Sequence, residues 1–259
     1  MTKLVWDHVG DRLYETGLDK GVLYLSDGTG VAWNGLTSAG ISSESAAIEP
    51  IYFDGKKIFD LKTPGNFAGT ISAITFPDEF IEYDGVSSVS QGVFLDSQPV
   101  KTFSLSYRTL IGDELEGTTA GYKIHVLYNL TAVSDVISYQ TIGSNVDPIT
   151  FSWAITSVPE QRNNHRQTGH VIFDSTKMDP IALIALEDLL YGTGITEPTL
   201  PNLNELLTPF VVTITDNGNG TWTAEGPDYL VSMLDLNTFQ ILWANATYLN
   251  PYTYKISST

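Results

Sequence analysis

Apolar and polar residues alternate over several short stretches of this chain, and glycine-rich turns separate the stretches. A period of two is typical of β-strands that bury one face. In one stretch, Phe103, Leu105 and Tyr107 share a face opposite Ser104 and Ser106. The pattern predicts a mainly β fold. The clearest predicted strands are residues 69–76, 101–109, 121–129 and 149–155.

Residues 34–66 form a long excursion between predicted strands. Within it, the sequence "IYFDGKKIF" places Asp54-Gly55 between two β-prone runs, which indicates a hairpin with a two-residue turn. Excursions of this length in compact domains are generally functional or disordered.

One helix is predicted in "MDPIALIALEDLLYG". Asp179 is suited to the N-cap, Pro180 to the first turn and Gly192 to the exit. The segment is apolar almost all round, so we expect it to pack against a sheet.

The sequence divides into three parts. Residues 1–197 form the main β domain, and the proline-containing residues 198–209 are expected to form a linker. Residues 210–259 contain five short strand-like runs at the spacing of a small β-module.

The composition of the chain restricts the classes of function that it can have. Thirty acidic and thirteen basic residues give a formal net charge of −17, which argues against wrapping duplex nucleic acid because phosphate contacts need lysine and arginine. Cysteine is absent from the sequence, which excludes disulfides and thiolate metal sites. Neither a signal peptide nor a membrane span is predicted, so we expect a protein made and kept in a cytoplasm.

Candidate chemistry is sparse, and we predict no catalytic residue, metal site or cofactor. His165 and His170 lack the spacing of a metal motif and are expected in a polar loop, while His125 is expected on a solvated or interface face. No serine lies in a nucleophile elbow, and the paired glycines are expected to be turns rather than a phosphate cradle.

An acidic cluster offers one enzymatic alternative. Asp78, Glu79, Glu82 and Asp84 lie within seven residues and could act as the acid and base of a glycosidase. A solvated loop is the simpler interpretation in a chain this acidic.

The polar faces of the predicted strands are small and uncharged. Strands that form a sheet edge usually carry charged residues that discourage pairing with other chains. The scarcity of charged residues on these strands favours a sheet that neighbouring subunits complete. These polar-face residues include Thr102, Ser104, Ser106, Thr150 and Ser152.

Several long strings occur in a familiar order: "GDRLYETGLDKGVLYL", "GVAWNGLTS", "YFDGKK", "TFPDEF" with "YDG", "FSLSYRTLIGDE" with "GYKIHVLYN", and "FSW". Together they resemble the major tail proteins, or tail tube proteins, of long-tailed bacteriophages, especially those infecting actinobacteria. The resemblance covers roughly residues 4–192. It implies a β-sandwich subunit with one flanking α-helix, whose strands join those of neighbours into a closed barrel.

The resemblance also implies a function. The chain would be a structural virion protein, assembled in the bacterial host cytoplasm into stacked hexameric rings that form the tail tube. Its partners would be other copies of itself and the tape measure, tail terminator and baseplate proteins. Viral DNA would pass through the lumen without specific binding, and no membrane would be involved.

If the chain forms such a tube, we hypothesise tasks for particular residues, with the lumen-facing residues chosen from the alternation pattern. The stretch from residue 10 to 25 is expected to be an assembly strap: its charged half pairs with neighbouring subunits and its apolar half enters the sheet. The hairpin of residues 48–61 is expected to reach the adjacent ring, and the polar-face residues named above are expected to face the lumen. The expected subunit and ring contacts are Asp11, Arg12, Glu15, Asp19, Lys20, Tyr52, Asp54, Gly55, Lys56 and Lys57.

A different class of function stays open. Five tryptophans and thirteen tyrosines could supply the platform of a carbohydrate-binding or adhesive β-sandwich protein. Most of these aromatic residues lie on apolar strand faces, which is typical of core or interface positions.

Overall fold

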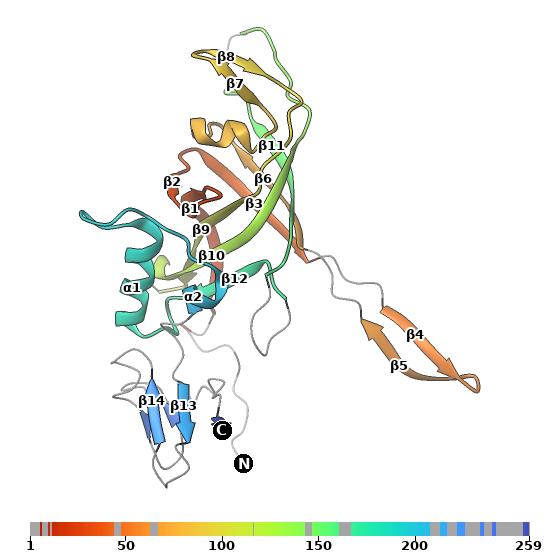
Figure 1. The fold of residues 1–259 in the computed structure, drawn as a ribbon, viewed down its shortest axis with the longest axis vertical. Coiled ribbons are helices and arrows are strands. Elements are labelled where there is room, and N and C mark those ends of the chain that lie inside the picture. The colour runs from red at the N-terminus through yellow and green to blue at the C-terminus, as the bar shows by residue number, and fades with distance from the viewer. Residues whose placement is uncertain are drawn as a thin grey trace.

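The computed structural model describes residues 6, 10, 12–43, 48–62, 67–115, 117–142, 147–160 and 167–207, together with short strands between residues 213 and 258. Strands dominate these residues, and the helix α1 (Pro180–Tyr191) lies against one side of the main sheet (Figure 1). The prediction of a mainly β fold with one flanking helix is confirmed.

The main sheet is antiparallel and has eight strands, in the order β2-β1-β9-β10-β11-β6-β3, with β12 also paired to β10. Four of them, β6, β9, β10 and β11, coincide with the clearest predicted strands. Two strands differ from the prediction. Strand β1 includes the charged half of the strap as well as the apolar half, and β12 was not predicted. The strands are β1 (Tyr14–Tyr24), β2 (Gly30–Ala32), β3 (Leu36–Ser43), β6 (Phe67–Ala73), β9 (Phe103–Asp113), β10 (Gly117–Ser134), β11 (Phe151–Ser157) and β12 (His170–Asp174).

The sheet bends around an aromatic core. Residues from opposite ends of the strand order, such as Leu23 of β1 and Ile71 of β6, belong to the same buried cluster, so the two ends of the sheet curl toward each other. At its centre Phe80 lies 4.6 Å from Trp33 and 5.1 Å from Trp153, measured between ring centroids. Tilted and edge-to-face contacts of this kind add to the stabilisation from burial.

The outer face of the sheet, opposite the aromatic core, is covered over one half. Helix α1 begins at Asp179, whose carboxylate accepts hydrogen bonds from the backbone of Ile181 and Ala182, as the capping pattern predicted. Leu186 and Leu190 are buried against the sheet. We call this side, formed by β1, β9, the first part of β10 and β12, the covered half.

The expected linker is packed rather than free. Leu200, Leu203 and Leu206 are buried with α1 in the covered half, and the last two belong to the short helix α2 (Leu203–Leu207). The Tyr128 hydroxyl donates to the carbonyl of Pro201 at 3.2 Å. The described part of this segment therefore packs against the main sheet and α1, because its leucines complete an apolar cluster. That residues 198–209 link two domains stays a prediction.

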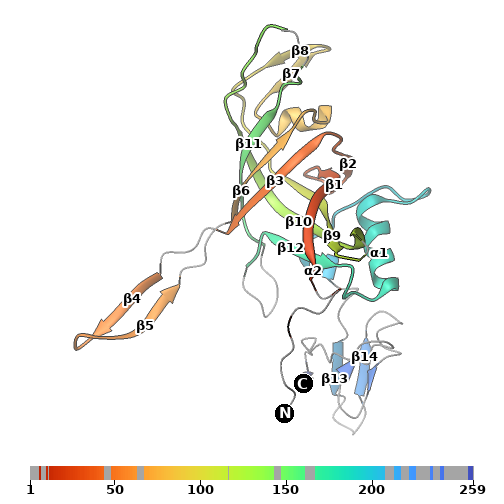
Figure 2. The same ribbon diagram turned by 180° about the vertical axis from the view of Figure 1, so that it is seen from behind.

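Two hairpins stand away from the main sheet (Figures 1 and 2). The first consists of β4 (Ile48–Phe53) and β5 (Lys56–Lys62), and we call it the arm. Asp54 and Gly55 both have positive φ, at 49° and 73°, as the tight turn requires. The second consists of β7 (Ser87–Ser90) and β8 (Val93–Leu95), which follow the 3₁₀ helix η1 (Asp78–Glu82).

The excursion is shorter than the sequence predicted. Leu36–Ser43 forms β3 and pairs with β6 in the main sheet, so the arm alone projects. Small residues such as Gly40 and Ser42 obscured the strand, because they give a weak apolar pattern.

Each of the five strand-like runs near the C-terminus overlaps a described strand, two of them only at the end of the run. They are β13 (Thr213–Asp216), β14 (Trp222–Glu225), β15 (Leu234–Asp235), β16 (Gln240–Ile241) and β17 (Ile256–Ser258). β13 pairs with β14 antiparallel and with β17 parallel, and β15 pairs with β16. A separate C-terminal module stays a prediction.

Candidate assembly surfaces

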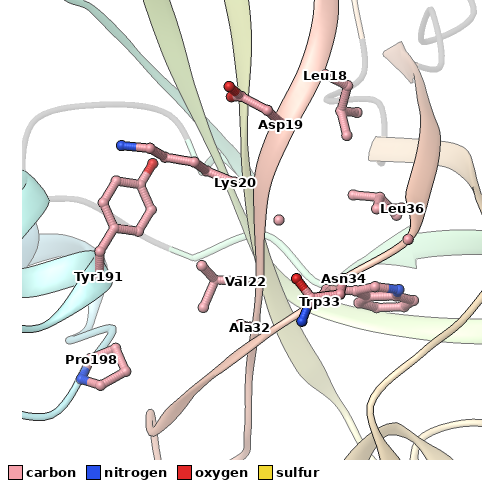
Figure 3. Close-up of a pocket in the computed structure, with 12 residues that line it drawn as sticks. Leu18, Asp19, Lys20, Val22, Ala32, Trp33, Asn34, Leu36, Tyr191 and Pro198 are labelled. Atoms are coloured by element: carbon pink, nitrogen blue, oxygen red, sulfur yellow. The ribbon is translucent and has the colours of Figure 1, made fainter.

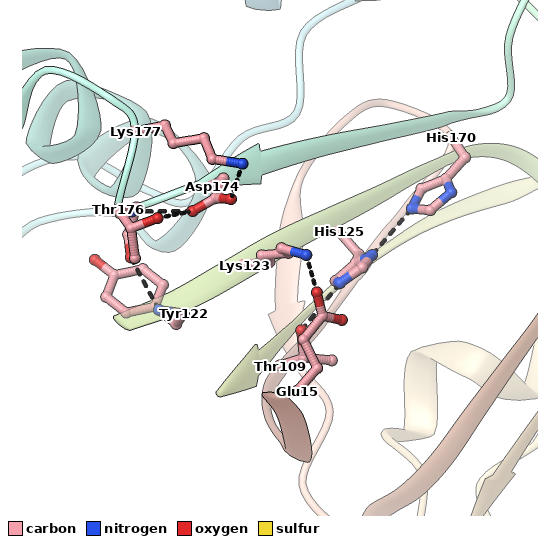
Figure 4. A network of polar contacts seen from close by, with 10 residues as sticks. Glu15, Thr109, Tyr122, Lys123, His125, His170, Asp174, Thr176 and Lys177 are labelled. Atoms are coloured by element: carbon pink, nitrogen blue, oxygen red, sulfur yellow. Dashed lines mark hydrogen bonds and ion pairs between the residues drawn. The ribbon is translucent and has the colours of Figure 1, made fainter. Parts of the chain in front are cut away.

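The charged half of the strap is part of β1 and is held by its neighbours in the sheet. Arg108 of β9 donates from Nε and Nη2 to the two carboxylate oxygens of Asp19, at 2.7 and 2.6 Å. These hydrogen bonds lower the pKa of Asp19, although burial acts in the opposite direction. Lys123 of β10 forms an ion pair with Glu15 (Figure 4). The two carboxylates are thus placed by their own chain.

The remaining strap residues also have contacts within the chain. Arg12 lies 3.4 Å from Glu114 in an exposed ion pair. The ammonium group of Lys20 lies 5.1 Å from the centroid of the Tyr191 ring at the end of α1. Asp11 lies outside the described residues. Contacts of these residues with other subunits remain a prediction.

Strand β1 contacts the connection between β2 and β3. The Trp33 amide donates to the Gly21 carbonyl at 2.8 Å, which ties the two segments together. Beside this bond lies a cavity of about 490 Å³, lined by Asp19, Lys20 and Tyr191 among others (Figure 3). It is a surface recess of mixed polarity rather than an enclosed ligand pocket.

A second cavity of about 490 Å³ opens between β1 and β3, and a histidine pair lies in it. His125 Nδ1 is 3.1 Å from His170 Nε2, and His125 Nε2 is 3.1 Å from the hydroxyl of Thr109 (Figure 4). The Tyr107 ring stacks on His125 at 4.8 Å. Burial lowers the pKa of both histidines to about 4, so both rings are neutral at pH 7 and one donates to the other.

This arrangement corrects two expectations. His125 is 8% exposed rather than solvated, and His170 begins β12 rather than lying in a polar loop. The cause is the pairing of β12 with β10, which sequence periodicity did not reveal. Among the described residues, no group of three or more histidine, aspartate or glutamate side chains could hold a metal ion.

The arm carries the expected contact residues at its exposed tip. Tyr52 and Phe53 are 61% and 68% exposed, and they pair across the hairpin with Lys57 and Lys56. Ile58 is also exposed. Large apolar side chains exposed together on a projecting hairpin are typical of an interaction site.

One residue predicted to face a lumen is buried. Ser106 has no exposed surface, and its hydroxyl lies 3.2 Å from that of Tyr24, which also donates to the carbonyl of Leu190 at 2.8 Å. Its alternation with the core residues was predicted correctly, but α1 covers the polar face at this point. Ser106 is therefore a packing residue beneath the helix.

The other four residues predicted to face the lumen have different environments. Thr102 and Thr150 are exposed in loops just before β9 and β11, and Ser104 is half-buried. The Ser104 hydroxyl accepts a hydrogen bond from the Asn129 amide at 3.2 Å. Ser152 lies on the outer face of β11, away from α1.

The face that includes Ser152 is uncovered by α1, and we call it the bare half. It comprises the end of β10 together with β11, β6 and β3. Its side chains are exposed or half-buried, all are small or β-branched, and none is charged. The strand register aligns them in three rows: Thr131–Thr156–Ala68–Ser42, Val133–Ala154–Thr70–Gly40 and Ser152–Ser72–Ser38.

The acidic cluster is not assembled as a catalytic pair. Asp84 is half-buried and accepts a hydrogen bond from the Trp153 indole at 2.8 Å, and burial raises its pKa. Glu82 forms an ion pair with Lys101, while Asp78 and Glu79 are exposed. Asp84 thus anchors a core tryptophan, which the sequence did not reveal.

The carbohydrate-binding alternative finds little support among the described side chains. Trp33 and Trp153 lie in the aromatic core, where a sugar ring has no access. Trp6 is exposed at a position apart from the described sheet.

Comparisons with known proteins give only distant matches. No family model and no curated protein matches the chain. Among solved structures, a chain from the baseplate of the anti-feeding prophage aligns over 69% of this chain and 100% of its own length, with 11% identity and a TM-score of 0.33. A chain from the extended sheath–tube complex of an extracellular contractile injection system aligns over 60% of this chain and 88% of its own length, with 12% identity and a TM-score of 0.30.

A chain from the tube-terminating cap of the anti-feeding prophage covers 68% of this chain and 97% of its own, with 14% identity and a TM-score of 0.30. TM-scores at this level do not establish a shared fold. In the part of the chain that the structure describes, helices are too short or too polar to span a membrane.

Proposed function

We propose that this chain is a structural subunit of a phage tail tube. Copies assemble into rings, hexameric by the resemblance of the sequence, and the rings stack into a conduit through which DNA reaches the host. The ordered strings between residues 10 and 153 support this assignment. The protein has no catalytic task and functions in the virion, with tape measure, terminator and baseplate proteins as further partners.

The bare half is the observation that carries the proposal. Proteins bind DNA without sequence preference mainly through lysine and arginine contacts to phosphates. A wall built from the bare half offers no such contact, because none of its rows contains a charged residue. The net charge of −17 per chain adds repulsion, so DNA can slide past.

Open strand edges support assembly into a continuous sheet. Among the described strands, β3 pairs with β6 alone, and it forms one end of the strand order. Exposed edges are normally protected or paired, and closure into a barrel removes them. Arg12 precedes β1 and Lys20 lies in it, near the other end of the strand order, where a second subunit can meet them.

Negative-stain electron microscopy of the concentrated protein tests the proposal. Rings or hollow tubes of uniform width are expected after a day of incubation. Because tube proteins can wait for an initiator, the same test is repeated with fragmented tubes added as seeds. A protein that stays monomeric under both conditions would contradict the proposal.

The strap has its own test. Arg12→Glu is expected to leave the subunit folded, because Arg12 is exposed and its ion pair with Glu114 is a surface one. Tube growth is expected to fall, since the change adds negative charge to an already acidic assembly. Lys177→Glu, which reverses the charge of another exposed cation that forms an ion pair within the chain, with Asp174, serves as the control. Tubes of normal length from the Arg12 variant would contradict a role of the strap in assembly.

A further inference from the structure

The far end of the body carries an apolar surface that the proposed function has not used. The β7–β8 hairpin and the connection between β10 and β11 lie side by side there (Figures 1 and 2). We call this surface the apolar end. Its side chains are half exposed or more, and they are Val89, Val93, Phe94, Leu95, Val136, Tyr139 and Ile142.

This surface is held firmly enough to serve as a docking site. The backbone amide of Gln98 donates to the carbonyl of Gly85 at 2.8 Å, which closes the base of the hairpin, and that of Val86 donates to the carbonyl of Ile81 at 3.2 Å, which ties the hairpin to η1. Large apolar side chains that are exposed together on one part of a protein are typical of interaction sites.

Carboxylates lie beside the apolar end. Asp96 follows β8 directly and Asp135 follows β10, and both are exposed. Asp96 lies near Asp84, whose pKa is raised mainly by burial and further by this neighbouring charge. The nearby Lys101 forms an ion pair with Glu82. The apolar end therefore carries exposed carboxylates as well as exposed apolar side chains.

The tip of the arm has the complementary chemistry. Tyr52, Phe53 and Ile58 are exposed there, and Lys56 and Lys57 share the same tip. We propose that the arm tip of one copy packs on the apolar end of a second copy, with its lysines facing Asp96 and Asp135. This inference rests on the proposed function and names the surface that receives the arm.

A second copy fits this surface better than another partner does. Within one copy the arm projects away from the apolar end, so the two surfaces do not meet (Figures 1 and 2). Most surfaces of a chain with a charge of −17 repel one another, whereas the arm tip brings two lysines to a negative rim. A contact between two different surfaces repeats from copy to copy and builds a filament.

Cross-linking tests the contact directly, because the natural chain contains no cysteine. Lys56→Cys and Ser90→Cys place thiols at the arm tip and beside the β7–β8 turn. The mixed single variants are expected to form disulfide-linked heterodimers, and the double variant a ladder. Lys56→Cys mixed with Asp188→Cys, on the exposed side of α1, is the matched control and is expected to stay unlinked.

The outcomes separate this contact from the proposed function. Tubes without the 56–90 cross-link, or with equal linkage to position 188, would overturn the contact and leave tube formation standing. Cross-linked ladders in a preparation without tubes would support the contact while contradicting the tube. Absence of both would overturn both.

Charge reversal provides a second measurement. Lys56→Glu with Lys57→Glu is expected to lower cross-linking between Phe53→Cys and Phe94→Cys by at least about tenfold, because like charges then face each other. Asp96→Lys with Asp135→Lys in the other copy is expected to restore it. Circular dichroism confirms that each variant is folded. Unchanged cross-linking, or no recovery in the paired reversals, would contradict the proposed pairing.

Discussion

The two halves of the outer sheet face differ in what their side chains contact. On the covered half, Tyr24 and Ser106 are fully buried beneath Leu190 of α1, and leucines from α2 complete the cluster. On the bare half, Thr70 and Ala154 occupy equivalent outward positions and are exposed. The same sheet thus uses one half of this face for its own stability and leaves the other for contact outside the subunit.

The difference shows that a polar-looking strand face has two physical uses. Small hydroxyl side chains allow a helix to approach closely, as Ser106 does beneath α1. They also make a surface that binds neither DNA phosphates nor apolar groups strongly, as we propose for the bare half. Which use applies is decided by whether another element packs there.

The largest effect on stability is expected in the covered half. Leu190→Ala removes a fully buried side chain and should lower the free energy of unfolding by about 2–5 kcal/mol. Ile184→Ala on the exposed side of the same helix should change it by less than about 0.5 kcal/mol. Urea denaturation measures both. Equal effects of the two substitutions would mean that α1 does not pack as described.

The next largest effect on stability is expected from acid, through the histidine pair in the cavity between β1 and β3. The folded pKa of each histidine, about 4, lies below the value of about 6.5 in the unfolded chain. The unfolded state therefore binds more protons in this window, and stability that is complete above pH 6.5 is lost as the pH falls toward 4. Allowing for solvent screening, protonation of the histidine pair should lower the free energy of unfolding by about 2 kcal/mol.

Urea denaturation from pH 7 to 4.5 measures this loss, and His125→Gln with His170→Gln should flatten it. The charged groups beside the pair are Lys123 and Glu15, which form their own ion pair. A pH dependence as steep in the double variant as in the natural protein would assign the loss to other groups.

A smaller effect is expected at the start of α1. Asp179→Ala removes the acceptor for two backbone amides and should cost about 1 kcal/mol. Asp188→Ala, an exposed carboxylate inside the helix, is the control and should be close to neutral. Thermal unfolding followed by circular dichroism distinguishes the two, and an equally mild result for both would mean that the cap contributes nothing.

The smallest effect on stability, and a large one on function, is expected in the bare half. Thr70→Lys should alter the free energy of unfolding by less than about 0.5 kcal/mol because the position is exposed. Tubes of this variant should retain duplex DNA at low salt and release it at high salt. Asp188→Lys adds the same charge on α1 and serves as the control. Equal DNA retention by both variants would argue against a lumen formed by the bare half.

Local signals predicted a substantial part of the fold. Alternation gave β6, β9, β10 and β11, and a cap, a proline and a glycine gave α1, because each of these elements is specified by neighbouring residues. The arm was visible from its Asp54-Gly55 turn for the same reason.

The parts that were missed depend on long-range contacts. The Asp19–Arg108 pair brings the charged half of the strap into the sheet across 89 residues, and Tyr24 meets Leu190 across 166. The burial of His125 depends on β12. Sequence alternation showed that Ser106 and Ser152 avoid the core, but only the docking of α1 shows that one is covered and the other is not.

A three-dimensional reconstruction of the tube by electron cryomicroscopy would show which half of the sheet face lines the channel. We expect Thr70 and Ala154 to line it, with the exposed side of α1 away from it. A tube in which α1 faces the channel while the bare half lies on the outside would contradict this expectation.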